Sequence, residues 1–350
     1  MAPNQTRVRT YTDKKDPSPA SPSASVILIS PANTVLLLHR KQTSSAFPSA
    51  HVFPGGNLDP SDGELPASPT DANRHRESLA YRIGAIRELF EETGILLAKE
   101  SAGATSLLKV SDRARLHGRK AVHGGQLAFR QWLADQSAAA ILHTDGLTPF
   151  THWITPANVP KRFTTQMYIY FVHLKETDNP SIQATGDEVE TMHPEYKSAR
   201  EWMRLAQAGD AILFPPQFLL LHLISHFLDV DDASATSTSA VDIIARRRRL
   251  YDFITTDQTP VPWTHKYISP LATSSPLDGD DRLVLRLNQP GPELEGSGLV
   301  GDDSHVVLTK FKREGPRELE VKLRADVFPD EEKPKKTQTS SGGSGGSSRL

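Results

Sequence analysis

Apolar positions recur either with helical spacing or in short β-branched runs, so the hydrophobic pattern predicts a chain of mixed helices and strands. Two β-branched runs, at 25–30 and 34–40, flank Pro31-Ala32-Asn33 and predict a β-hairpin. Further strands are predicted at 166–174, 282–287, 305–311 and 319–323. Helices are predicted at 79–97, within 109–140, and at 197–208, 215–228 and 241–253.

Polar stretches rich in Pro, Ser or charge separate these elements and predict the domain organisation. We expect a disordered N-terminus at 1–22, one folded domain at 23–230 and a flexible tail at 329–350. The segment 240–328, called the C-terminal extension below, is expected to hold one helix followed by strands. An acidic, Ser/Thr-rich stretch at 229–241 is the predicted linker between the domain and this extension.

Composition narrows the chemistry that the chain can perform. The 350 residues include no cysteine, which excludes disulfides, thiolate zinc sites and cysteine nucleophiles. The formal net charge is −2, so nothing in the overall charge predicts nucleic acid or an anionic membrane as partner. No apolar run approaches the length of a membrane span.

The chemically informative segment lies in the helix predicted after residue 79. Glu88, Glu91 and Glu92 stand at i, i+3 and i+4, so they share one helix face, where like charges repel. A divalent cation with oxygen ligands would offset that repulsion, and Arg87 can reach Glu91 one turn along. Gly94 is placed to end the helix directly after the carboxylates. A solvated acidic face is the alternative interpretation.

The segment Arg87 to Ile95 resembles the second half of the Nudix box, G-x5-E-x7-R-E-U-x-E-E-x-G-U, where U is aliphatic. The first half departs from that pattern: counted back from Arg87, its Glu falls on Leu79 and its Gly on Asn73. A glycine pair stands earlier, at 55–56, so an insertion of 17 residues separates the two halves. The resemblance implies an α+β fold, an α/β/α sandwich whose mixed β-sheet lies between helices, with a helical insertion and a C-terminal β-rich extension.

Flanking segments point to one branch of that family. The segments 36–40, 47–56, 153–156 and 160–165 are similar to the peroxisomal branch that hydrolyses coenzyme A and acyl-coenzyme A. The second Arg and the Gly that a general coenzyme A signature expects between Arg40 and Phe53 are absent. This resemblance implies cleavage of the diphosphate bond to 3′,5′-ADP and (acyl-)4′-phosphopantetheine. Two alternatives stay open: a Nudix pyrophosphatase acting on NADH, ADP-ribose or another nucleoside diphosphate, and a non-catalytic Nudix-fold binding module.

The same resemblance assigns expected roles to individual residues. Catalysis is expected from Glu88, Arg87, Glu91 and Glu92, with Glu88 as first choice for the base and Glu188 or Glu190 as alternatives. Mg²⁺ or Mn²⁺ is expected on Glu88, Glu91, Glu92 and the Gly56 carbonyl. Substrate binding is expected from Arg40, Gly55, Lys161 and Arg162.

The last three residues, Ser348-Arg349-Leu350, are a variant of the S-K-L peroxisomal signal at the end of a Gly/Ser-rich tract. They predict a peroxisomal location and a peroxisomal import receptor as partner. The cytoplasm and the mitochondrion are the alternative locations.

Overall fold

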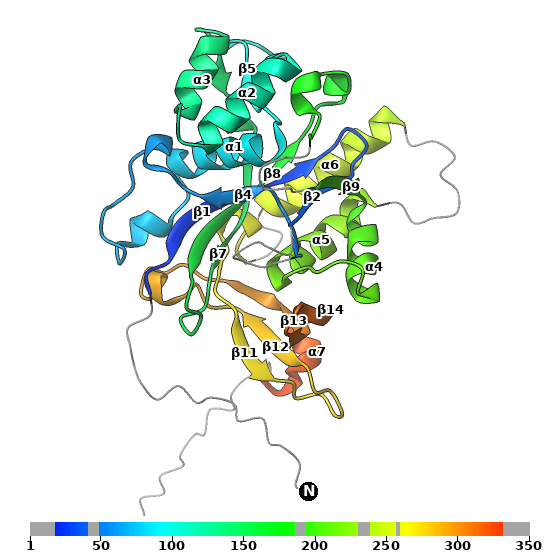
Figure 1. The fold of residues 1–350 in the computed structure, drawn as a ribbon. Helices are drawn as coiled ribbons and strands as arrows, with labels where there is room; N and C mark the ends of the chain where they lie inside the picture. The colour runs from blue at the N-terminus through cyan, green and yellow to red at the C-terminus, as the bar shows by residue number, and fades with distance from the viewer. Residues whose placement is uncertain (1–17, 41–48, 186–192, 230–238, 257–259, 332–350) are drawn as a thin grey trace, which may run out of the picture.

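A mixed β-sheet forms the centre of the computed structural model, which describes residues 18–40, 49–185, 193–229, 239–256 and 260–331 (Figure 1). Within these residues the sheet has eight strands. Its order is β10 (Tyr267–Ile268), β7 (Thr148–Ile154), β8 (Phe163–Phe171), β1 (Ser21–Ile29), β2 (Val35–His39) and β3 (His51–Val52), with β4 (Gly55–Asn57) paired to β1 and β9 (His193–Lys197) paired to β2. The pairs β1–β8 and β7–β10 are parallel and the other pairs are antiparallel.

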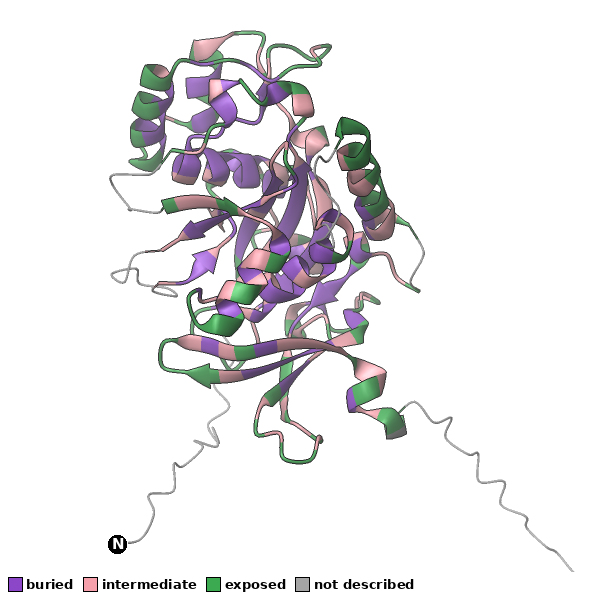
Figure 2. Ribbon diagram, turned by 90° about the vertical axis from the view of Figure 1, so that its right-hand side faces the viewer, coloured by how far each residue is buried: buried purple, intermediate pink, exposed green. Residues whose placement is uncertain are grey.

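Strand β1 is buried on both faces because alternate residues enter two separate hydrophobic cores. Val26 and Leu28 pack toward α1 (Leu79–Thr93), together with α2 (Asp112–His123) and α3 (Phe129–Gln136). Ile27 and Ile29 pack on the opposite side, against α4 (Ala199–Ala208), α5 (Pro215–Leu228) and α6 (Ala240–Thr255). The predicted α+β fold with a sheet between helices is confirmed, and Figure 2 shows the central strands as its buried layer.

Most predicted elements form where the periodicity placed them. The hairpin pairs Ile29 with Val35, and the helix predicted at 215–228 has those bounds. The helix predicted over 79–97 ends at Thr93, because Gly94 adopts a left-handed conformation with φ 73° and caps it. Strand β7 was not predicted, since it carries Pro149 near its start. A small pair, β5 (Ala98–Lys99) with β6 (Ile141–Leu142), was also missed.

The C-terminal extension forms a second sheet beside the first. Its strands are β11 (Leu271–Ser274), β12 (Leu283–Leu287), β13 (Asp302–Lys312) and β14 (Gly315–Leu323), joined in that order. One face, with Leu285 and Val307, enters the core around α5, while the other face packs on α7 (Arg324–Val327). The extension also supplies β10 to the main sheet, where it pairs with β7. The domain boundaries at 23–230 and 240–328 stay a prediction.

Within the extension, a buried ion pair links the residue before β10 to the start of β13. Lys266 Nζ lies 2.7 Å from Asp302 Oδ1, and His305 Nδ1 lies 2.8 Å from Asp302 Oδ2. The Lys266 ammonium also lies 3.8 Å from the centre of the Trp263 ring.

Among the described residues, no helix is both long and apolar enough to cross a membrane.

Candidate active site

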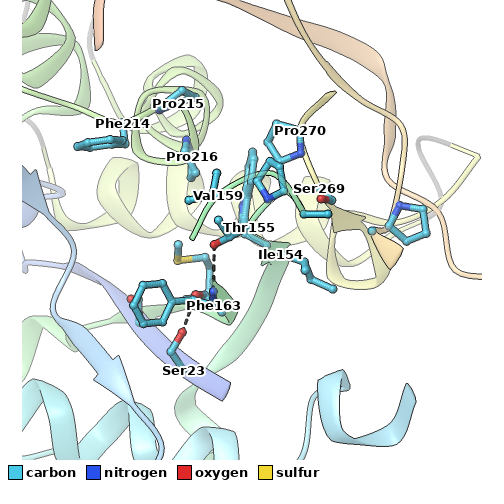
Figure 3. Close-up of a pocket in the computed structure, with 18 of the residues that line it drawn as sticks. Ser23, Ile154, Thr155, Val159, Phe163, Phe214, Pro215, Pro216, Ser269 and Pro270 are labelled. Atoms are coloured by element: carbon cyan, nitrogen blue, oxygen red, sulfur yellow. Dashed lines mark hydrogen bonds between the residues drawn. The ribbon is translucent and has the colours of Figure 1, made fainter. Parts of the chain in front are cut away.

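The described residues enclose a cleft of about 1770 Å³ that runs from α1 to the C-terminal extension. Its walls come from β1 and β4, the acidic face of α1, the loop at 155–161, the start of α5 and the strands of the extension. Figure 3 shows side chains from three of these parts, Val159, Pro216 and Pro270, around the same space. The site is therefore assembled from segments far apart in the sequence.

Helix α1 brings the three predicted carboxylates to one wall of this cleft. Glu88, Glu91 and Glu92 all line it, as do Gly55 and Gly56 of β4. Their i, i+3, i+4 spacing accounts for the shared face. The alternative interpretation of an acidic face in bulk solvent does not describe these side chains, because the exposed fraction of the Glu88 side chain is 15% and that of Glu91 is 9%.

Arg87 holds the carboxylate cluster in place. Its Nη1 donates to Glu88 Oε1 and to Glu91 Oε1, each at 2.8 Å, so the contact expected from the i+4 spacing is present. Its Nε and Nη2 donate to the two oxygens of Asp62 at 2.9 and 2.8 Å. Burial alone would lower the pKa of Arg87, but the hydrogen bonds that it donates to Asp62 and the charge of Glu88 outweigh burial and raise that pKa.

Asp62 was missed in the sequence because the motif was counted backward from Arg87. Counted forward from Gly56 with the spacing G-x5-E, the acidic position falls on Asp62, and the insertion follows it. The exposed fraction of Asp62 is 1%, and it ends the 3₁₀ turn η1 (Pro60–Asp62), where it also accepts a bond from Asp59 N at 2.8 Å. A Cβ on Gly84 would lie 2.9 Å from Asp62 Oδ2, so this glycine gives the carboxylate room beside α1.

The two glycines of β4 allow the backbone to approach the carboxylates closely. Gly55 N donates to Glu92 Oε2 at 2.8 Å. A Cβ at Gly55 would lie 2.2 Å from Ser25 Oγ, and one at Gly56 would lie 2.5 Å from Glu88 Oε2. Gly55 therefore excludes a side chain, and a side chain at position 56 would require the Glu88 carboxylate to move.

Two buried arginines of α2 bind the end of α1, where the carboxylates stand. Arg119 donates to the carbonyl of Glu91 at 3.2 Å and to that of Glu92 at 2.8 Å, and Arg115 donates to the carbonyl of Gly94 at 2.9 Å. Cations at a helix C-terminus satisfy carbonyls that lack helical partners and offset the helix dipole. The sequence pattern gave no sign of these long-range contacts.

The electrostatic environment of Glu88, Glu91 and Glu92 favours additional positive charge. Burial raises the pKa of Glu88 to about 7, and the neighbouring charge of Glu91 adds to this although Arg87 opposes it. His123, at the end of α2, also lines the cleft, with Nδ1 3.3 Å from Glu91 Oε2. A buried carboxylate that resists ionisation is the environment in which a bound cation is stabilising.

A divalent cation fits this chemistry, although its ligands are not prearranged. Among the described residues, no three His, Asp or Glu side chains are arranged as a ready metal cage. The glutamate oxygens instead bind Arg87 and Gly55 N, so a cation would compete with those donors. The hard oxygen donors and the charge of the cluster are those that Mg²⁺ or Mn²⁺ prefers.

The predicted substrate-binding cations have different positions. Arg40 and Lys161 line the cleft, and Arg40 Nε is buried without a hydrogen-bond partner in the described structure. Arg162 does not line it: its exposed fraction is 2%, and it pairs with Glu293 and donates to the carbonyls of Thr155 and Ser18. The prediction of Arg162 as a phosphate contact is corrected to a structural link between the 155–161 loop and the extension.

Some predicted residues lie outside the described structure. These are the alternative bases Glu188 and Glu190 and the predicted targeting residues Ser348, Arg349 and Leu350.

A comparison with family models agrees with this geometry. The model of the NUDT19 Nudix domain matches residues 66–224. Over this segment the chain is similar to the Nudix hydrolases. Nudix hydrolases in general use divalent metals, which agrees with the donor set on α1. The match includes the segment from Arg87 to Gly94 and the helices that support it.

Similar proteins include a nudix hydrolase and acyl-coenzyme A diphosphatases. The "Putative nudix hydrolase 7" of Caenorhabditis elegans is 30% identical over 210 residues, covering 60% of this chain and 62% of that protein. The acyl-coenzyme A diphosphatase NUDT19 of Xenopus laevis is 26% identical over 248 residues, covering 57% of this chain and 61% of that protein. The chain thus spans about three fifths of the length of these relatives.

Among solved structures, the chain is similar to a NUDIX hydrolase from Alicyclobacillus acidocaldarius. The two share 22% identity with a TM-score of 0.47, over 58% of this chain and 90% of that one.

Proposed function

We propose that this chain hydrolyses the diphosphate bond of coenzyme A or acyl-coenzyme A in a divalent-metal-dependent reaction, giving 3′,5′-ADP and (acyl-)4′-phosphopantetheine. The observation that carries the proposal is that Glu88, Glu91 and Glu92 face the Gly55-Gly56 backbone within one cleft. The choice of coenzyme A is supported by the similarity to NUDT19 of Xenopus laevis and Gallus gallus, both acyl-coenzyme A diphosphatases.

The residues of the cleft have different roles in this proposed reaction. Glu88, Glu91, Glu92 and the Gly56 carbonyl would hold Mg²⁺ or Mn²⁺, which neutralises diphosphate charge and lowers the pKa of a water when bound. Arg87 keeps two of these carboxylates in position through hydrogen bonds of 2.8 Å. Glu88 is our choice for the residue that accepts the proton of the attacking water, because it lies beside Gly56 on the cleft wall.

Arg40 and Lys161 supply positive charge for the anionic substrate. Both line the same cleft as the carboxylates. Because Arg40 Nε is buried without a partner in the described structure, a phosphate oxygen there would satisfy a donor that otherwise lacks a hydrogen bond.

A substrate panel tests the proposal. Purified protein is incubated with Mg²⁺ or Mn²⁺ and either coenzyme A, acyl-coenzyme A, NADH or ADP-ribose, and the products are identified by mass. We expect 3′,5′-ADP from the first two substrates at a higher kcat/KM than any product from the others. Preferential cleavage of NADH or ADP-ribose would assign a different nucleoside diphosphate, and binding without turnover would indicate a non-catalytic module.

The variant Glu92→Gln tests the role of the carboxylate cluster. Loss of one charge from the cluster should lower kcat more than about 100-fold, as the removal of a group that stabilises transition-state charge does. The matched control is Glu201→Gln on α4, an exposed glutamate paired with Arg204 at 2.8 Å and outside the cleft. Near-normal turnover by Glu92→Gln, with the control also active, would rule out the proposed site.

A peroxisomal location is a separate proposal, based on Ser348-Arg349-Leu350 and an import receptor that reads such a terminus. A fluorescent protein carrying the last dozen residues should enter peroxisomes, and the same fusion without the final three should not. Diffuse fluorescence of the first fusion would contradict the proposal and leave the cytoplasm or the mitochondrion.

A further inference from the structure

Large apolar side chains are exposed along one part of the cleft. Val159, Leu271, Leu283, Val300 and Phe311 have exposed fractions between 36% and 54%, and all five line the cleft. Single exposed apolar residues are common, but a group of them in one concave surface marks a binding site. Four of the five belong to the C-terminal extension, so this part of the chain builds the apolar wall.

The wall is the uncovered end of a sheet face that is buried elsewhere. On β12 and β13, Leu285 pairs with Val307 and both pack in the core around α5. Leu283 stands two residues before Leu285 on β12 and pairs with Thr309. Phe311 stands two residues after Thr309 on β13. Leu283 and Phe311 lie on the cleft wall, where nothing in the described structure buries them as it buries Leu285.

Charge is distributed unevenly along the cleft. Outside the C-terminal extension, the charged or titratable residues that line the cleft are Arg40, Glu88, Glu91, Glu92, His123 and Lys161. Among the described residues, the C-terminal extension adds one charged residue, Glu295, to the lining. One end of the cleft therefore suits a polyanion and the other an uncharged aliphatic group.

We infer that the C-terminal extension binds an aliphatic chain attached to the substrate, and that Leu283 and Phe311 select for it. The inference rests on the proposed function, in which this chain is the acyl group of acyl-coenzyme A. The apolar wall and the carboxylates border one continuous cleft of about 1770 Å³, well above the roughly 300–1,000 Å³ of common ligand sites. An anionic diphosphate joined to an aliphatic tail fits both ends of this space. A protein partner bound at the apolar wall would not explain why the wall and the carboxylates line the same cleft.

Kinetics with matched substrates test the inference. The enzyme is assayed with coenzyme A and dodecanoyl-coenzyme A, which differ in the acyl chain alone, as wild type and as the variants Leu283→Ser and Phe311→Ser. Each variant should lower kcat/KM for dodecanoyl-coenzyme A about tenfold and leave that for coenzyme A within about twofold. Ile244→Ser, an exposed residue of α6 outside the cleft, is the matched control and should change neither value.

A second variant tests the shape of the wall. Leu283→Trp fills the same space, so it should shift the preference from dodecanoyl- to butanoyl-coenzyme A. Equal kcat/KM of the wild type on coenzyme A and dodecanoyl-coenzyme A would overturn the inference and leave the proposed function intact. So would an equal loss on both substrates in the serine variants. Wild-type turnover of other nucleoside diphosphates alone would remove the proposed function first and this inference with it.

Discussion

Replacing Asp62 with alanine removes the contact that orients Arg87 from outside its own helix. Asp62 accepts hydrogen bonds from Arg87 Nε at 2.9 Å and Nη2 at 2.8 Å, and from Asp59 N at 2.8 Å. Both members of the ion pair are buried, with exposed fractions of 1% for Asp62 and 6% for Arg87. In Asp62→Ala, the guanidinium stays buried with two of its donors no longer bound to a carboxylate.

The expected loss of stability follows from these contacts. Breaking a buried ion pair by removing one partner costs about 3–5 kcal/mol in the free energy of unfolding. Arg87 keeps Glu88 and Glu91 and also donates to the carbonyl of Asn57 at 2.7 Å, so its charge remains partly compensated. We therefore expect the lower end, about 3 kcal/mol.

Urea unfolding followed by tryptophan fluorescence measures this loss, and Asp71→Ala is the control. Asp71 lies in the insertion that follows Asp62 and caps a 3₁₀ turn, η2 (Ala72–His75), by accepting a bond from Asn73 N at 2.8 Å. It is more exposed than Asp62, and its loss should cost about 1 kcal/mol, as for an ordinary N-cap. The difference of about 2 kcal/mol between the two variants isolates the contacts with Arg87.

Asp62→Ala should also impair catalysis in the absence of urea, where the variant is still folded. Glu88 and Glu91 share Nη1 of Arg87, so a guanidinium that tilts away from its former position moves both carboxylates. If Asp62→Ala and Asp71→Ala differed by less than about 0.5 kcal/mol in stability, the reasoning about this buried pair would be refuted.

Two further predictions concern backbone approach and acid stability. Gly56→Ala places a Cβ 2.5 Å from Glu88 Oε2. Because that flexible carboxylate can move aside, we expect little change in Tm, but turnover should fall at least about tenfold since Glu88 leaves its position. Unchanged turnover would contradict the tight approach of the Gly56 backbone to Glu88. Burial would raise the pKa of Asp302, but the hydrogen bonds from His305 and Lys266 outweigh burial and lower that pKa below its ordinary value of 3.8. The contribution of Asp302 to stability is therefore complete above pH 3.8 and is lost as the pH falls through the folded-state pKa. Wild type should therefore lose more free energy of unfolding than Asp302→Asn as the pH is lowered from 5 to about 3, and parallel losses would contradict this assignment.

The sequence predicted the elements that depend on local periodicity. The spacing of Glu88, Glu91 and Glu92 is a property of any α-helix, and the stop at Gly94 follows from its tolerance of a left-handed conformation. Strand β7 escaped prediction because its pairing with β8 stabilises a segment whose local sequence, with Pro149 near its start, gives a weak strand signal. The prediction for Arg162 was wrong because a pattern of basic residues does not reveal that Glu293, far along the chain, binds it.

By itself the sequence determined that three carboxylates share a helix face and that a glycine pair lies upstream, because both depend on neighbours within a few residues. Tertiary structure alone decided that Asp62 orients Arg87, that Arg119 binds the end of α1, and that the C-terminal extension forms the apolar wall of the cleft. These contacts join residues separated by 25 positions or more, so they exist only once the sheet has fixed where each segment lies. Local spacing can place charges on one face, but only the packed chain determines which groups meet them.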